Sequence, residues 1–173
     1  SKDLTEYHHY LEKLFEASKY ILSEAEEKIL GTTYKTSHEN WIRMVSSLLS
    51  KEEVEALDEG GKIKKHNLSS LISNTASVNK AVRDSAAKAI NQIFVKHLDI
   101  AENEINSILE NEKNLHTLKN IERPDTPRHL DDDIDTGIVD ALIAGVSSRY
   151  DLSHRFYELK SKLLGVEKLE YHE

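Results

Sequence analysis

The chain has 173 residues, a formal net charge of −8 at pH 7 and no cysteine. The length suits one domain with an apolar core, and we expect a single helical domain over residues 1–173. The acidic balance argues against nucleic acid, because binding phosphates requires a basic face. Without cysteine, disulfides, thiol catalysis and thiolate metal sites are excluded. No apolar run approaches the roughly 18–20 residues of a membrane span, so we expect a soluble protein without a membrane partner.

Amphipathic spacing predicts helices over most of the first fifty residues. Apolar side chains recur every three or four positions over residues 4–20, which is typical of a helix. Ser23 with Glu26 forms a capping box for a second, short helix. We expect that helix to end at Gly31 in a left-handed cap, and a second capping box to start a new helix at Thr36.

The middle of the chain predicts a ribbon and then a long helix. Gly60 and Gly61 suit a tight turn in a possible short β-ribbon around residues 52–66. Residues 62–123 contain neither Gly nor Pro, and apolar side chains recur there at helical spacing. We therefore expect one long central helix over residues 77–119 and an elongated fold, with a bend near residues 99–106 as the alternative.

Two prolines then predict a loop, since proline cannot continue a helix that precedes it. These are Pro124 and Pro127. Helices are expected over residues 136–148 and 152–164, the last closing on Gly165. The fold class is therefore all-α. In the last helix we expect four buried side chains, Leu152, Phe156, Leu159 and Leu163.

Nine histidines and many carboxylates invite metal sites, but their spacing in the sequence supports none. A zinc-peptidase helix needs H-E-x-x-H, and the pair His38-Glu39 lacks the second histidine. The acidic run 131–135 lacks the glycine and glutamate of a calcium loop, so helix capping explains it better. His97 falls among the apolar positions of the expected long helix. A histidine in such a position is more often a hydrogen-bonded core residue than a metal ligand. We expect no catalytic residue, metal ligand or cofactor in this chain.

Arg128 and His129 form the one polar constellation that the sequence places on a loop, beside the acidic run. Functional side chains concentrate on loops, so this pair is the candidate functional site. The sequence nevertheless favours the interpretation that Arg128 pairs with an aspartate and holds the loop in place.

Several runs resemble the oligoendopeptidase F family, in the family's order and over essentially the whole chain. No single motif is diagnostic, but the combined order is fairly specific. The runs are YHHYLE at 7–12, NLSSL at 67–71, VRDSA at 82–86, RPDTPRHLDDDI at 123–134, VDALI at 139–143, and FYELKSKLLGV at 156–166 followed by Leu169 and Tyr171.

The resemblance implies a bacterial, cytoplasmic zinc metallo-oligopeptidase of which this chain is the N-terminal, non-catalytic helical portion. In the parent, zinc held by H-E-x-x-H and a later glutamate would activate water, and a deep channel would admit short peptides. None of the family's catalytic or metal residues can be assigned to this chain. Arg128 and His129 become candidates for lining the channel, and the partners would be short peptides and the catalytic half.

The ends of the chain support the same expectation. Helical spacing begins almost at residue 1, no methionine starts the chain and no tail follows the last helix, so we expect a fragment. An independent helical protein-interaction module, without enzymatic activity, is the alternative hypothesis.

Overall fold

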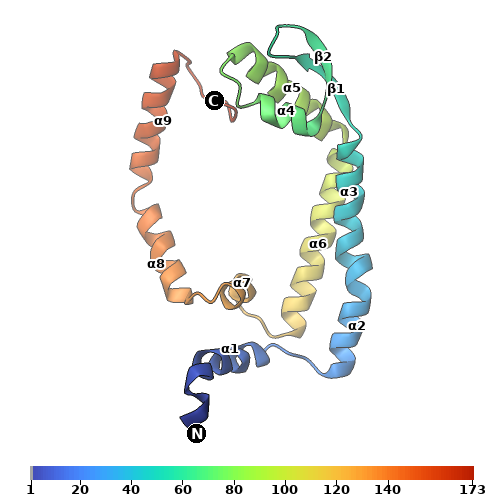
Figure 1. The fold of residues 1–173 in the computed structure, drawn as a ribbon, viewed down its shortest axis with the longest axis vertical. Helices are drawn as coiled ribbons and strands as arrows, with labels where there is room; N and C mark the ends of the chain where they lie inside the picture. Colours follow the sequence, from blue (N-terminus) through green and yellow to red (C-terminus); the bar gives the residue numbers. More distant parts are fainter. Residues whose placement is uncertain (1) are drawn as a thin grey trace. The chain divides into compact units, whose positions relative to one another are not determined.

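The computed structural model describes residues 2–173, with side chains from Leu4 onward. It is mainly helical with one small antiparallel sheet, which confirms the predicted fold class (Figure 1). The chain divides into a first unit, Ser1–Leu30 with Lys113–Leu169, and a second unit, Gly31–Glu112 with Glu170–Glu173. That the whole chain forms a single domain stays a prediction. None of the described helices is long and apolar enough to cross a membrane.

The helices and strands follow one another closely along the chain. Their bounds, in chain order, are η1 Lys2–Tyr7, α1 His8–Ser18, α2 Glu24–Tyr34, η2 Lys35–Glu39, α3 Asn40–Ser50, β1 Glu53–Leu57, β2 Ile63–Asn67, α4 Leu68–Asn74, α5 Lys80–Lys96, α6 Leu98–Leu118, α7 Thr126–Asp131, α8 Thr136–Ser147 and α9 Tyr150–Leu164.

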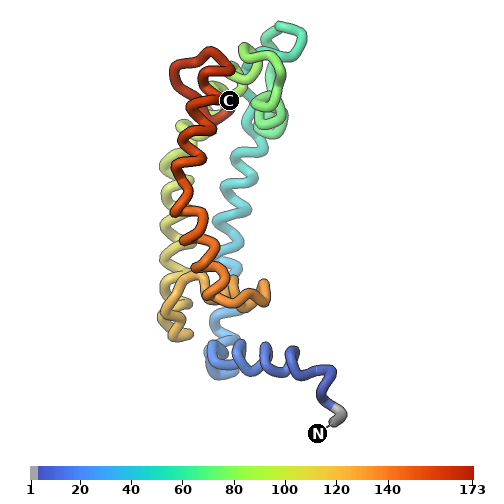
Figure 2. Tube along the Cα trace, turned by 90° about the vertical axis from the view of Figure 1, so that its left-hand side faces the viewer, coloured from blue at the N-terminus to red at the C-terminus, as the bar shows by residue number. Residues whose placement is uncertain are grey.

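The predicted break between α2 and α3 is wrong, because the backbone continues through a π-helical turn, η2, into α3. Figure 2 shows this stretch as one continuous coil. Gly31 lies inside α2 and is not among the residues with positive φ. Thr36 Oγ1 and Ser37 Oγ both donate to the carbonyl of Thr33, at 2.9 and 3.0 Å. The hydroxyls therefore bind carbonyl groups of the preceding turn instead of capping a new helix.

The predicted ribbon is confirmed and packs against α4 and α5 in the second unit. Strands β1 and β2 pair antiparallel, with Glu53 opposite Asn67 and Leu57 opposite Ile63. Gly61, at φ +75°, supplies the left-handed residue of the connecting turn. The core of this unit combines side chains of the ribbon and of α4 with the small and branched side chains of one face of α5. Its buried members are Ala56, Leu71, Ala86, Ala89, Ile90 and Ile93.

The expected long central helix is divided at His97 into α5 and α6. At φ −110° and ψ 16°, His97 departs from helical geometry, and α6 leaves in a new direction (Figure 1). The His97 ring lies 2.8 Å from Glu52 Oε1, and Lys96 donates to the same carboxylate, also at 2.8 Å. His97 is thus hydrogen-bonded and largely buried, as the sequence predicted, while the break falls before the expected bend.

The C-terminal helices of the first unit follow their predicted bounds closely. Asp135 caps α8 by accepting from the amide of Gly137 at 2.8 Å, and Gly165, at φ +67°, ends α9. The expected burial in α9 is wrong, since no described residue of α8 or α9 is buried. The four side chains expected to be buried have exposed fractions of 46% for Leu152, 59% for Phe156, 56% for Leu159 and 78% for Leu163.

Candidate functional site

The predicted loop around Arg128 and His129 contains a short helix, α7. Pro127 lies within the first two positions of that helix, where a missing N–H costs nothing, so this proline starts a helix that the sequence analysis did not expect. The amide of His129 donates to the carbonyl of Asp125 at 3.1 Å. After α7 the backbone turns through Asp133, at φ +56°, into α8. This short segment of the first unit presents all the residues of the candidate site.

The structure separates the two predicted site residues. The side chain of Arg128 is 78% exposed and its Nε donates to Asp132 at 2.6 Å, one helical turn away. His129, in contrast, is buried, with Nδ1 3.0 Å from Thr136 Oγ1. The expected pairing of Arg128 with an aspartate is confirmed. Whether either residue lines a peptide channel stays a prediction.

Arg123, which sequence reasoning did not single out, organises the segment. Its guanidinium donates to both oxygens of Asp125, at 2.8 and 2.7 Å, and to both oxygens of Asp140 on α8, each at 2.9 Å. Two forked carboxylate contacts suit the planar guanidinium. They raise the pKa of Arg123, lower the pKa of Asp125 to about 2 and lower the pKa of Asp140. Arg123 therefore stays charged and ties the entry of α7 to α8.

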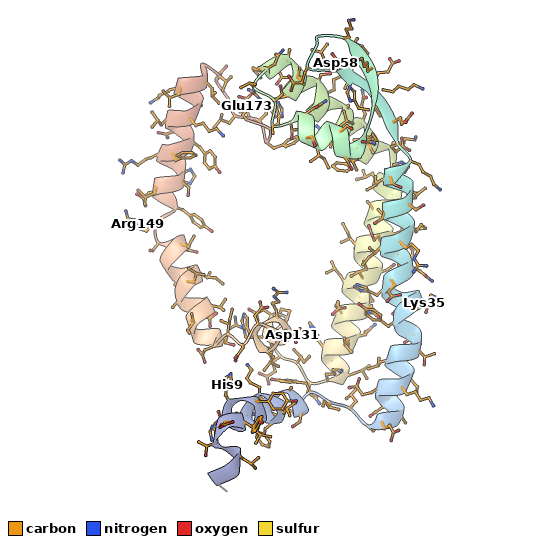
Figure 3. All side chains as sticks on the ribbon, in the orientation of Figure 1. His9, Lys35, Asp58, Asp131, Arg149 and Glu173 are labelled. Atoms are coloured by element: carbon orange, nitrogen blue, oxygen red, sulfur yellow. The ribbon has the colours of Figure 1, made fainter. Side chains whose placement is uncertain are left out.

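The aspartates of the acidic run contact basic side chains and a backbone amide of the same unit. Asp133 accepts from Lys13 at 2.7 Å and lies 2.6 Å from His9 Nε2 on α1, and these two partners, Lys13 first, lower the pKa of Asp133. Figure 3 shows α1, which carries His9, beside α7, which carries Asp131. Asp135 caps α8 and Asp133 pairs with α1, and these two roles account for the carboxylates without a calcium ion.

One arrangement at this site has the residue types of a nucleophile, a base and an acid. The His129 ring lies between Thr136 Oγ1 and the Asp125 carboxylate. However, Asp125 Oδ2 is 3.6 Å from His129 Nε2, which is too far for a hydrogen bond. Both Asp125 oxygens accept from Arg123 instead. A carboxylate held by arginine does not orient the histidine as a catalytic base requires. The geometry orders the backbone between α6 and α8, and it supports no covalent chemistry.

Only a weak signal in the sequence could have pointed to Arg123. The spacing Arg123-x-Asp125 puts opposite charges close together, but Asp140 lies 17 positions away. Which of the aspartates in this region meets Arg123 depends on how α7 turns the chain, and spacing alone does not show that.

Comparisons with known proteins agree with the resemblance noted in the sequence. The family model described as Oligopeptidase F matches residues 1–51. An "Oligoendopeptidase F homolog" of Lactococcus lactis subsp. lactis (strain IL1403) is 26% identical over 184 residues, which cover 98% of this chain and 28% of that protein. A crystal structure of oligoendopeptidase-F from Enterococcus faecium superposes with a TM-score of 0.81 at 19% identity, over 99% of this chain and 33% of that one.

The likeness at 19% identity shows a shared fold, and the curated relative adds similarity in sequence. The chain spans less than a third of the length of the curated relative. The expected resemblance is therefore confirmed, and this chain resembles the N-terminal region of oligoendopeptidase F proteins over nearly its whole length.

Proposed function

We propose that the chain is the non-catalytic, channel-forming helical portion of a bacterial, cytoplasmic, zinc-dependent oligoendopeptidase that hydrolyses short peptides. The alignment with the Lactococcus protein carries this proposal, because it takes in 98% of this chain and 28% of a protein named for peptide hydrolysis. The catalytic half of the parent would supply the zinc and the activated water, and this portion would help limit substrates to short peptides.

The residues present here do not fit the catalytic zinc. His38 belongs to the π turn η2, where its ring stacks on Tyr34 with centroids 4.9 Å apart. Its Nδ1 lies 3.9 Å from Glu112, and no histidine follows Glu39 at the position that H-E-x-x-H requires. We therefore assign no step of peptide hydrolysis to this chain.

The apolar surfaces of α8 and α9 suit a portion that works with further protein or with peptide. Their exposed side chains include Ile138, Leu142, Phe156 and Leu163. Exposed apolar side chains in such number mark contact surfaces in soluble proteins. The same surfaces are the observation that favours the alternative, an independent helical interaction module without enzymatic activity.

A peptidase assay separates the two functions. The 173-residue chain and a longer polypeptide that contains it are each incubated with short fluorogenic peptides, with and without a chelator. We expect cleavage by the longer polypeptide alone, and its loss with the chelator. Chelator-sensitive cleavage by the 173-residue chain would contradict the non-catalytic assignment. A longer polypeptide without peptidase activity would favour the interaction module.

A further inference from the structure

Three side chains of metal-binding type meet in the second unit. Asp84 on α5 and the neighbouring residues His172 and Glu173 each offer one ligand atom, and these atoms all lie within 4.8 Å of one another. His172 Nε2 is 2.9 Å from Asp84 Oδ1, across 88 positions of sequence. Figure 3 shows Glu173 beside the α4 and α5 helices. Spacing in the sequence could not show this cluster, since the fold brings its members together.

Two of these side chains are buried with an atom left unsatisfied. His172 and Glu173 have side-chain exposures of 8% and 1%. Nevertheless, His172 Nδ1 and Glu173 Oε2 have no hydrogen-bond partner among the described residues. Unpaired buried polar atoms are rare in native proteins, and each calls for an explanation, such as an ion. A carboxylate that binds an ion through both oxygens would satisfy Glu173 Oε2.

An ion can reach the cluster from solvent. A cavity of about 740 Å³ is lined by Asp84 and His172, together with Lys80 and Tyr171. The Tyr171 hydroxyl donates to the carbonyl of Ala87 at 3.4 Å, and its ring meets the His172 ring edge to face at 5.2 Å. These contacts fix the histidine against α5. The ligands are thus held in position beside an opening.

A protein cation already binds the two carboxylates. Lys80 Nζ donates to Asp84 Oδ1 at 2.8 Å and to Glu173 Oε1 at 2.8 Å, while Arg83 Nη2 lies 3.6 Å from Glu173 Oε1. The lysine side chain is half exposed and has a flexible stem. It can swing into solvent when another cation takes its place, whereas Arg83 also donates to the carbonyls of Ser77 and Val78 and is held there.

We propose that Asp84, His172 and Glu173 form a binding site for one divalent transition-metal ion, which displaces the Lys80 ammonium. One imidazole and two carboxylates suit zinc and its first-row neighbours, with water as a further ligand. We assign no catalytic role to this site, and none of its three residues belongs to the candidate site around Arg128 and His129. The bound ion ties residues 170–173 to the start of α5. This proposal replaces the expectation, based on spacing alone, that the chain binds no metal.

Calorimetric titration of the chelator-treated 173-residue chain with Zn²⁺ tests the site. We expect one ion per chain, and a loss of at least about tenfold in affinity for Asp84→Asn, which keeps the size of an exposed side chain but removes its charge. Lys80→Met gives the sharper result. Removing the competing positive charge of Lys80, whose Nζ lies 2.8 Å from an oxygen of each carboxylate, should raise the affinity about fivefold or more.

Two controls keep the outcome clear. His154→Asn, on an exposed histidine of α9, should leave Zn²⁺ binding unchanged. Circular dichroism of each variant verifies that the helices remain. Absence of Zn²⁺ binding in the unaltered chain would overturn the proposal. So would equal affinity in the folded Asp84→Asn variant, or an affinity that falls when Lys80 is replaced.

Discussion

Arg123 and Asp140 join through two hydrogen bonds of 2.9 Å each, so that the residue before Pro124 is fixed to the second turn of α8. Replacing Arg123 by Gln removes this link and the contact to Asp125. We expect faster amide hydrogen exchange in α7, with exchange in α5 unchanged. Arg128→Gln is the matched control, because its single ion pair is exposed. Faster exchange in the Arg128 variant than in the Arg123 variant would contradict the assignment.

Acid should weaken the first unit through the same contact. The pKa of Asp125 is lowered to about 2 by Arg123 in the folded chain, below its ordinary value near 4. A carboxyl group whose pKa is lower in the folded state stabilises that state at pH values above its unfolded pKa. This contribution to the free energy of unfolding is lost as the pH falls from about 4 through about 2. Urea unfolding from pH 6 to pH 2 should show this loss. The Arg123→Gln variant should lose less stability over the same interval, and an equal loss would assign the acid sensitivity to other carboxylates.

Two glycines should respond to alanine with opposite signs. Gly165 has φ +67°, while Gly31 is helical, and an added Cβ meets nothing within 4 Å at either position. Gly165→Ala should therefore cost about 1–2 kcal/mol through backbone strain alone. Gly31→Ala should stabilise by about 0.5–1 kcal/mol, because alanine favours a helix interior. Thermal unfolding measures both changes, and a stabilising Gly165→Ala would contradict the left-handed cap.

One serine hydroxyl adds a hydrogen bond to the apolar packing between the ribbon and α5. Ser85 Oγ accepts from the amide of Leu57 at 2.9 Å, at the end of β1. Ser85→Ala leaves that half-buried amide unpaired, and we expect a loss of about 1–3 kcal/mol. Ser73→Ala is the control, since its exposed hydroxyl only donates to the carbonyl of Ser69 in its own helix. Equal effects in denaturant unfolding would show that the ribbon does not depend on this bond.

The proposed channel role of Arg128 needs the longer polypeptide. Charge reversal, Arg128→Glu, places a third carboxylate group beside Asp131 and Asp132. We expect KM for short peptides to change while the zinc content stays the same. Zinc content is measured by elemental analysis and KM by fluorogenic cleavage. Loss of zinc with unchanged KM would contradict a role in peptide binding.

The parts of the fold that sequence predicted are those with local causes. The cap at Asp135, the ribbon turn at Gly61 and the end of α9 at Gly165 each depend on residues within a few positions. The division at His97 has no such cause, because neither Gly nor Pro is near. It coincides with a contact to Glu52, 45 positions away, which no helical pattern reveals.

The sequence predicted where along the chain the candidate site lies, but not how its side chains are arranged. The sequence located Arg128 and His129, yet it could not tell that one is exposed and the other buried, because a loop was expected where α7 forms. Apolar spacing likewise identified the apolar residues of α9 without indicating whether anything covers them.

The π turn at Lys35–Glu39 changes the direction in which side chains leave the helix axis between α2 and α3. Each α-helical residue rotates the chain by about 100°, so one extra residue in a turn shifts every later side chain around the axis by that angle. Val45, the buried residue of α3, owes its orientation to this shift. Deleting Ser37 should restore a regular helix and leave Val45 facing the same side, because a π turn uses one more residue than an α turn for about the same rotation. Residues 35–39 therefore determine which side chains of α3 face inward, whatever the apolar spacing in α2.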